Sequence, residues 1–330
     1  MSNKAKIIEY LAQASTPLSG EQLSQQLGVS RTMVWKYIQL LNEEGYSIQA
    51  IKKKGYVLHG LSNQLTKENL DYYLTTRHFA REFTSFETCN STQIVANEQL
   101  LQRDVAHGAV FVSEEQTAGK GRLNRPWSSS KGKGLWMTWV LKPNLLPHEA
   151  PPITLVVALA VAKAIATTTG IQVDIKWPND LLIDGKKTGG ILTELQATPD
   201  KIEAILVGIG LNVLHESNDF GVDLSSIATS LQLHCEQPVN RLQLLAAVAS
   251  ELESAVEQFE TSGFQPFQHQ WEQHSKMIGQ EITATTVRET ITGTAVGLNE
   301  FGALLVSTDD GVRTLFSGDV TLSGKLDSLS

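Results

Sequence analysis

The sequence is poor in cysteine and has no long apolar run. Its 330 residues contain only two cysteines, Cys89 and Cys235. This is too few for the disulfide framework of a small secreted protein, so we expect buried, reduced thiols. No apolar stretch approaches the roughly 20 residues that a membrane-spanning helix needs. The polar, charged N-terminus lacks the features of a signal peptide. These absences predict a cytoplasmic protein that does not enter a membrane.

Negative charge predominates overall, but not at the N-terminus. The net charge is −8, yet the first 62 residues hold seven cations against four acids, a balance of +3, and the remainder carries −11. We expect only the N-terminal part to meet nucleic acid, because the acidic remainder should repel it. The length predicts two or three domains, and a hydrophobic share of 41% is ample for their cores.

The first 60 residues have the pattern of a winged helix-turn-helix. Apolar residues at helical spacing predict three helices; the second ends at Gly28 and the third follows the N-cap residue Ser30. Two short strand patterns then flank the segment 52–55, which predicts a hairpin, or wing, with a cationic tip. A helix-turn-helix can also serve protein contacts alone, but helix, turn and wing together favour DNA.

The recognition helix and the wing supply the expected DNA contacts. Side chains near the start of a recognition helix read base edges, whereas wing lysines contact phosphates. The predicted DNA-binding residues are Ser30, Arg31, Thr32, Lys36, Lys52, Lys53 and Lys54. Trp35 is equally compatible with a place in the core and with base reading.

Strands and helices alternate after a polar hinge at residues 61–68, which predicts an α+β fold with a central mixed sheet. The predicted strands are Ala109–Ser113, Leu135–Leu141, Val173–Lys176, Gly190–Leu195 and Ala204–Ile209, and the predicted helices are Pro152–Thr168, Arg241–Phe259 and Phe264–His274. From about Met277, short apolar strands punctuated by glycines predict a small β-barrel. The expected domains are residues 1–64, 65–276 and 277–330.

The segment Gly119–Trp127 alternates glycines with cations and ends in a tryptophan. Glycines let the backbone approach a ligand and turn its N–H groups toward an anion, while Lys120, Arg122 and Arg125 add charge and directed donors. Trp127 offers a flat face for a ring. The pattern is neither a Walker loop nor a dinucleotide fingerprint. It is typical of a cradle for phosphate and carboxylate, although a solvated basic loop would also read this way.

Six ordered motifs give the chain a resemblance to a known family. They are Asn90–Gln93, Glu115–Thr117, Gly119–Trp127, Lys176–Leu181, Gly185–Leu192 and Gly208–Asn212. Together with the N-terminal module they resemble the bifunctional biotin–protein ligase and biotin operon repressor family over essentially the whole chain. The resemblance implies a central domain of the biotin/lipoate ligase type and an SH3-like C-terminal barrel.

The resemblance also implies the chemistry. Biotin and ATP, with Mg²⁺, would give biotinyl-5′-AMP, and the biotinyl group would pass to a lysine of the biotin carboxyl carrier domain of a carboxylase. The adenylate would also be the corepressor that makes the protein a homodimer on operator DNA.

The resemblance assigns site residues in three sets. It places Lys187 and Arg122 in catalytic positions. The implied biotin-binding residues are Ser91, Thr92, Gln93, Gln116, Lys120, Gly121, Arg122, Lys187 and Gly190. The implied nucleotide-binding residues are Gly119, Arg125, Trp127, Asn179, Asp180 and Asn212. No dedicated metal site is expected, and Mg²⁺ would arrive with ATP, near Asp180.

Some of these residues have a second, structural interpretation. Asn90-Ser91-Thr92 is also a plausible helix N-cap, and Trp177 suits the core as well as a ligand contact. Many relatives read Gly-Arg-Gly-Arg-Arg-Gly-Arg in the loop, where this chain has Lys120, Leu123 and Asn124 at three positions. Lysine keeps a charge but loses the bidentate fork of arginine. Relatives often carry Asn in place of Gln93.

Three alternative functions are distinguished by particular residues. A transcription factor that only senses biotin would not need Lys187, Asn179 and Asp180. A lipoate ligase would not need the polar set Ser91, Thr92 and Gln116 that suits a ureido ring. A ligase without repressor activity would not need the DNA-binding residues of the winged helix.

Overall fold

The computed structural model describes residues 3–60 and 62–322. The chain separates into two compact units, residues 1–74 and 75–330, and each is described by itself. None of the helices in the described ranges combines the length and the apolar character that a bilayer crossing requires. Cys89 and Cys235 are free thiols, as expected, but each is only half-buried, and this partial burial raises the pKa of both.

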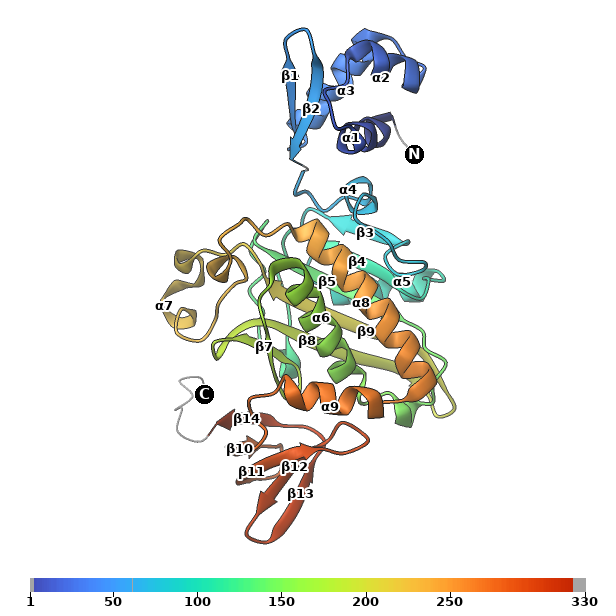
Figure 1. Cartoon of the computed structure of the whole chain (residues 1–330). Coiled ribbons are helices and arrows are strands. Elements are labelled where there is room, and N and C mark those ends of the chain that lie inside the picture. The colour runs from blue at the N-terminus through green and yellow to red at the C-terminus, as the bar shows by residue number, and fades with distance from the viewer. Residues whose placement is uncertain (1–2, 61, 323–330) are drawn as a thin grey trace. The chain divides into compact units, whose positions relative to one another are not determined.

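The first unit has the predicted winged helix-turn-helix (Figure 1). Its elements are α1 (Asn3–Gln13), α2 (Gly20–Leu27), α3 (Arg31–Glu43), β1 (Ser47–Ile51), β2 (Gly55–Gly60) and α4 (Lys67–Asp71). Ser19 and Gln22 form a capping box at the start of α2, and Gly28, with φ of 66°, ends that helix. Ser30 caps α3 by accepting a hydrogen bond from the Met33 amide at 3.2 Å. The predicted apolar face is buried, with Ile7, Leu11, Leu23, Val34, Ile38 and Leu41 at its centre.

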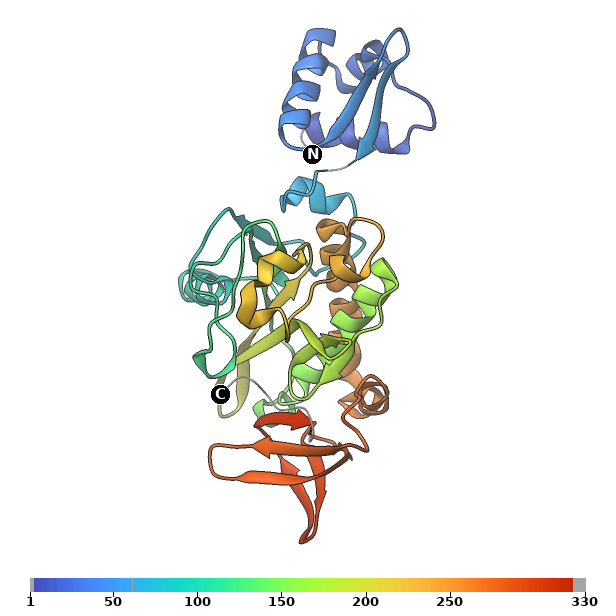
Figure 2. The same cartoon turned by 90° about the vertical axis from the view of Figure 1, so that its left-hand side faces the viewer.

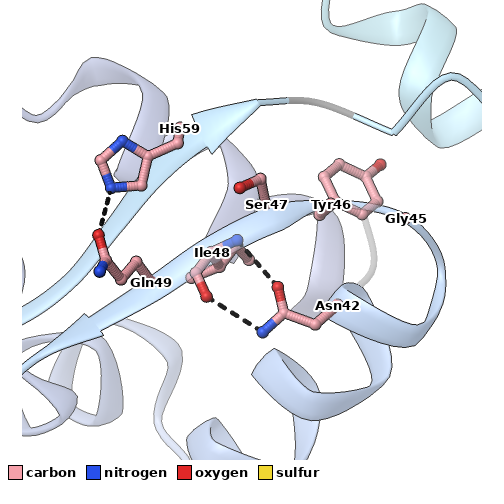
Figure 3. Close-up of a pocket in the computed structure, with 7 residues that line it drawn as sticks. All are labelled: Asn42, Gly45, Tyr46, Ser47, Ile48, Gln49 and His59. Carbon is pink, nitrogen blue, oxygen red and sulfur yellow. Dashed lines mark hydrogen bonds between the residues drawn. The ribbon is translucent and has the colours of Figure 1, made fainter.

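The wing is fixed to the helices by its backbone. Leu18 and Tyr56 exchange two backbone hydrogen bonds, which join β2 to the segment before α2. On the other side, the Asn42 amide at the end of α3 pairs with the backbone of Ile48, accepting from its N–H at 2.8 Å and donating to its carbonyl at 3.1 Å (Figure 3). Both strands are therefore tied to the helical body, and the turn at residues 52–54 projects from a supported hairpin.

A seven-stranded mixed sheet forms the centre of the second unit. Its strands are β3 (Phe83–Phe86), β4 (Ala109–Ser113), β5 (Gly134–Leu141), β6 (Asp174–Lys176), β7 (Asp180–Ile183), β8 (Lys186–Thr198) and β9 (Lys201–Asn212). Their order is β3-β4-β5-β9-β8-β7-β6, and every neighbouring pair is antiparallel except β3 with β4. The two longest strands, β8 and β9, therefore lie in the middle of the sheet.

Helices cover both faces of this sheet. α5 (Thr92–Gln102) packs on β4, β5 and β9, whereas α6 (Ile153–Thr169) and α8 (Arg241–Ser262) pack on each other and against β8 and β5 on the opposite face (Figures 1 and 2). α6 is buried around most of its circumference, as an almost wholly apolar helix between a sheet and a second helix should be. The short helix α7 (Gly221–Leu224) follows β9, and α9 (Gln265–Gln273) packs on α6 and on the later strand β11 (Thr290–Leu298).

A five-stranded antiparallel sheet follows α9. It contains β10 (Glu281–Thr285), β11 (Thr290–Leu298), β12 (Leu304–Thr308), β13 (Gly311–Leu315) and β14 (Asp319–Leu322), in the order β13-β12-β11-β10-β14. Polar contacts join it to the central domain: the Trp177 indole N–H donates to the Gly302 carbonyl at 3.1 Å, and the Leu298 N–H donates to Glu272 at 3.0 Å. Trp177 therefore belongs to the core, one of the two interpretations that the sequence left open.

Most predicted elements are confirmed, with longer strands than the patterns suggested. Ala109–Ser113 has the predicted bounds, whereas the predicted strands Gly190–Leu195 and Ala204–Ile209 are the middles of β8 and β9. The short strands β3 and β7 were not predicted, because four residues give too little alternation to be recognised.

Glu253 clamps the chain to α8 just before β3. It is 8% exposed, and its carboxylate accepts backbone hydrogen bonds from Arg77, His78 and Phe79, the shortest at 2.6 Å. Burial alone would raise the pKa of Glu253, but the three backbone donors outweigh it and lower the pKa below its ordinary value.

Glu253→Ala is expected to cost about 2 to 4 kcal/mol of unfolding free energy, because three backbone N–H groups, including that of the buried Phe79, lose their acceptor. A lowered pKa means that the carboxylate contributes stability above the unfolded-state pKa, about 4.3, and loses it as the pH falls through the folded-state pKa. Urea unfolding at pH 7 and near pH 3 tests both statements. The difference between wild type and variant should shrink at the lower pH; a difference independent of pH would contradict this account.

Candidate active site

Trp127 lies across a pair of glycines in the middle of the sheet. Gly190 of β8 and Gly210 of β9 are register partners. A Cβ atom added at Gly210 would lie 2.6 Å from the Trp127 ring, and one added at Gly190 would lie 3.3 Å from it. The two glycines therefore make room for the indole. Trp127 Nε1 is buried and makes no hydrogen bond within the described part of the chain, so a donor is left for a ligand atom.

Lys187 lies beside this tryptophan. Its Nζ atom is 2.6 Å from Asp180 Oδ1 and 5.3 Å from the centre of the Trp127 ring. The backbone of Lys187 is fixed as well, since its N–H donates to the Ile227 carbonyl at 2.7 Å and its carbonyl accepts from the Thr229 N–H at 2.9 Å. Lys186, the preceding residue, is exposed and donates to the Ser225 carbonyl. The two lysines thus have different surroundings, as the alternation of a strand predicts.

The ligand loop, residues Gly119–Trp127, folds back on itself. The Trp127 N–H donates to the Gly119 carbonyl at 2.9 Å, and the Gly121 N–H donates to the Arg125 carbonyl at 2.8 Å. At its tip, Leu123 and Asn124 adopt left-handed φ angles of 55° and 57°. A glycine is ordinarily favoured there, and leucine is strained, so these departures from the family motif concern backbone conformation as well as charge.

The two arginines of the loop reach beyond it. Arg122 Nη1 donates to Asn179 Oδ1 at 3.3 Å and to the Gly318 carbonyl at 3.2 Å. Arg125 forms an ion pair with Asp319. Asn179 is itself held by donating from Nδ2 to the Ile191 carbonyl at 2.8 Å. The loop tip is therefore connected to both the central sheet and the C-terminal barrel.

A buried polar cluster lies where α5 meets the sheet. Gln116 Oε1 accepts from the Thr92 N–H at 2.8 Å, and Gln116 Nε2 donates to Ser129 Oγ at 2.8 Å. The Thr92 hydroxyl is 2.8 Å from the Thr138 hydroxyl, which in turn donates to Gln93 Oε1 at 3.1 Å. Amides and hydroxyls can both donate and accept, so this cluster suits a compact neutral ligand that does both.

Ser91 and Asn212 stand at the start of α5 and the end of β9, and their side chains differ in how far they are engaged. Ser91 stands at the N-cap position of α5 and is buried, but its side chain makes no capping hydrogen bond. Its hydroxyl is therefore not committed to the helix. Asn212 Nδ2 donates to the Thr229 carbonyl at 3.1 Å, which links the end of β9 to the segment that also holds Lys187.

Comparison with known proteins decides the family. Residues 85–212 match the biotin/lipoate A/B protein ligase family, residues 3–57 match a helix-turn-helix domain, and residues 277–323 match the biotin protein ligase C-terminal domain. Over 317 residues the chain is 38% identical to the bifunctional ligase/repressor BirA of Bacillus subtilis (strain 168), covering 96% of this chain and 97% of the relative. The chain belongs to the family of bifunctional biotin–protein ligases and repressors.

Two further relatives support the family assignment. The chain is 29% identical over 325 residues to the bifunctional ligase/repressor BirA of Escherichia coli (strain K12), covering 96% of each chain. A solved biotin protein ligase from Aquifex aeolicus, in complex with biotin and ATP, is similar with a TM-score of 0.64 and 29% identity, over 74% of this chain and all of that one. The predicted family and three-part fold class are confirmed. The domain boundaries and the residue roles stay predictions.

Within this biotin–protein ligase, sequence patterns missed several residues of the site. Thr138 and Ser129 complete the polar cluster, and a Cβ atom at Gly208 would lie 2.8 Å from Gln93 Oε1. Asp319 is contributed by the barrel. The single threonine in an otherwise apolar strand, and the Gly208/Gly210 spacing that places both glycines on one face of β9, were the available signals.

The predicted DNA-binding residues are all exposed in the ligase's first unit. They comprise Ser30, Arg31, Thr32 and Lys36 on or beside α3, and Lys52, Lys53 and Lys54 in the turn of the wing. The hydroxyl of Ser30 is used for capping, which leaves the other six for outside contacts. Trp35 is 53% exposed, so it is not a core residue.

Proposed function

We propose that this chain activates biotin with ATP as biotinyl-5′-AMP, transfers the biotinyl group to a lysine of a carrier domain, and represses biotin genes with the adenylate as corepressor. One observation carries the enzymatic part. Lys187, Trp127, Asn179 and Arg122 are connected around the Gly190/Gly210 pair, next to a neutral polar cluster. Cations thus adjoin a cluster of neutral hydrogen-bonding groups, an arrangement that suits a ligand with a ureido head and a carboxylate tail.

The biotin side of the site would be the polar cluster. Thr92, Gln93 and Gln116 would bind the ureido ring, together with the uncommitted hydroxyl of Ser91. Lys120, Gly121 and Gly190 would line the valeryl chain and its carboxylate. The solved ligase from Aquifex aeolicus has biotin and ATP bound, which supports the same ligand pair here.

The nucleotide side would be formed by the ligand loop and the end of β6. Trp127 would stack on adenine, while Gly119, Arg125, Asn179 and Asn212 would contact ribose and phosphates. The described residues contain no group of three or more His, Cys, Asp or Glu side chains that could hold a metal ion. Mg²⁺ ordinarily binds through phosphates and one or two carboxylates. The Asp180 carboxylate would help to hold the ion, which would neutralise charge on the ATP phosphates.

The reaction has two displacement steps. A carboxylate oxygen of biotin attacks the α-phosphorus of ATP, and the bond to pyrophosphate breaks. The acceptor lysine then attacks the carbonyl carbon of the mixed anhydride, loses a proton, and releases AMP. Both steps bring anionic oxygens together, so Lys187 and Arg122 would act by stabilising charge on the carboxylate and the α-phosphate.

Intact mass spectrometry of an acceptor tests the enzymatic proposal. The protein is incubated with ATP, Mg²⁺, biotin and an unmodified carrier domain, and the acceptor should gain the mass of one biotinyl group. Lipoate in place of biotin separates this from the related lipoate ligase activity. Modification by lipoate alone, or by neither acid, would contradict the proposal.

The adenylate would also drive dimerisation. From Leu192 to Thr198, β8 pairs with β9 on one side and with no strand on the other, as far as the structure is described. Such an edge can pair with a second copy of the same edge or with a strand of the carrier domain. Competition between these two partners would couple demand for biotinylation to repression. Like a cytoplasmic location, the adenylate-driven dimer and its competition with the carrier domain stay predictions for this chain.

Sedimentation velocity tests the dimer proposal. Biotin plus ATP should shift the protein from monomer to dimer, because a ligand that prefers the associated state moves the population toward it. Excess unmodified carrier domain should then reverse the shift by consuming the adenylate. A monomer–dimer constant that does not respond to the ligands would contradict the coupling.

A further inference from the structure

The C-terminal barrel supplies a carboxylate to the ligand loop. Asp319 is the first residue of β14, and both loop arginines reach it: Arg125 forms an ion pair with Oδ2, and Arg122 Nη1 lies 3.7 Å from Oδ1. Arg122 also donates to the carbonyl of the preceding residue, Gly318, at 3.2 Å. Two adjacent residues of the barrel thus hold two cations that the ligand would use.

The position of Asp319 is set by the barrel. Asp319 pairs with Thr285 of β10, and a Cβ atom at Gly318 would lie 3.0 Å from the Thr285 carbonyl oxygen, so a glycine lets the chain approach β10 closely. The barrel is in turn joined to the catalytic core through Gly302 and Leu298. Asp319 is therefore a fixed point relative to the sheet that carries Lys187.

The loop tip has little other support. Leu123 is 69% exposed, and both Leu123 and Asn124 have left-handed backbone conformations. The side-chain hydrogen bonds and ion pairs that residues 122–125 make elsewhere in the described chain are those of Arg122 and Arg125 with Asn179, Gly318 and Asp319. Asp319 is therefore the side-chain partner of Arg125 in the described chain, and it adds to the hold that Asn179 and the Gly318 carbonyl have on Arg122.

We propose that Asp319 is a positioning residue for adenylate formation. It holds Arg122 and Arg125 where phosphate oxygens arrive, so that less freedom is lost when ATP binds. Each guanidinium has five N–H donors, and one carboxylate leaves donors free for phosphate. The inference rests on the proposed function, and it makes the barrel part of the nucleotide site.

Asp319→Asn tests the inference by the KM and kcat of adenylate formation, measured by exchange of labelled pyrophosphate into ATP. We expect the KM for ATP to rise about two- to fivefold, the range that loss of a partly exposed charge pair allows. The kcat and the KM for biotin should change less. Asp319 is 35% exposed, so the melting temperature should be nearly unchanged.

Two control variants separate positioning from other effects. Asp310→Asn removes the same charge from an exposed turn of the same barrel and should leave the KM for ATP unchanged. Asp319→Glu keeps a carboxylate and should recover most of the wild-type KM. In an Arg125→Gln background, Asp319→Asn should have a smaller effect, because the two residues act through one contact.

The outcomes divide clearly. A KM for ATP that is unchanged in Asp319→Asn, or that rises equally in Asp310→Asn, would overturn the inference. A KM that falls would show that the carboxylate competes with phosphate for the arginines, and would overturn it too. If the wild-type protein makes no adenylate, the proposed function fails instead, so the two failures are distinguishable.

Discussion

Lys187→Ala is expected to slow adenylate formation by about 10² to 10³-fold, which corresponds to roughly 3 to 4 kcal/mol in the activation free energy. The Nζ atom lies 2.6 Å from Asp180 Oδ1 and 5.3 Å from the centre of the Trp127 ring, beside Gly190. A lysine there can follow negative charge as it moves from the biotin carboxylate to the phosphate. Single-turnover formation of adenylate, with both substrates saturating, measures the effect directly.

Lys186→Ala is the matched control. The two lysines are consecutive on β8, but Lys186 is exposed and donates to the Ser225 carbonyl. Its loss should change the rate less than about threefold, as for a surface residue away from the reacting atoms. Thermal unfolding of both variants shows whether Asp180, left without its lysine, destabilises the fold. Equal rates in Lys187→Ala and wild type would remove Lys187 from the catalytic assignment.

Sequence patterns located the chemistry because it resides in short continuous motifs. Arg122 and Trp127 lie in a run of glycines and cations that ends in an aromatic residue, and that composition indicates ligand binding. Lys187 and Asn179 lie in the motifs Gly185–Leu192 and Lys176–Leu181, which the family resemblance assigns to the site. The structure brings these four together around Gly190 and Gly210. Their individual roles remain predictions until variants are measured.

The rest of the site depends on how distant segments pair. Thr138 belongs to the site only because β5 lies beside β9 and under α5, and neither neighbour can be read from the strand itself. Asp319 depends on a contact between two domains, and an aspartate at a strand start is otherwise unremarkable in sequence. Helical spacing also could not decide whether Trp35 is buried. It was compatible with a core position, but the exposed fraction of Trp35 is 53%.

Replacing the three wing lysines with glutamine is expected to weaken operator binding on the order of 10²-fold near 0.1 M salt. Lys52, Lys53 and Lys54 form the exposed turn of a hairpin that Asn42 and Leu18 hold against the helices. Such a turn can place all three charges near phosphates. Each lost phosphate contact removes about 0.9 from the slope of log K against log salt, so the slope should fall by up to about 3.

A control variant separates the long-range effect of the lost positive charge on DNA affinity from the loss of direct phosphate contacts. The triple variant Lys131→Gln, Lys201→Gln, Lys276→Gln removes the same charge from exposed positions of the second unit. It should leave the salt slope unchanged, because those lysines would not contact DNA. Titrations at four or five salt concentrations, with biotin and ATP present, compare the two triple variants with wild type.

Arg31→Ala is expected to change the sequence preference of DNA binding, whereas the wing variant changes its overall affinity. Arg31 is the first residue of α3, its side chain is exposed, and its distance of 3.9 Å to Glu21 makes only a weak ion pair. It is therefore free to read a base edge, which is worth about 1 to 3 kcal/mol of discrimination at one position. Loss of Arg31 should relax the sequence preference at that base pair in each half-site. The wing variant should instead weaken binding to all sequences alike. If both variants weaken binding to every sequence equally, α3 does not read the operator through Arg31, and specificity must come from other residues of that helix.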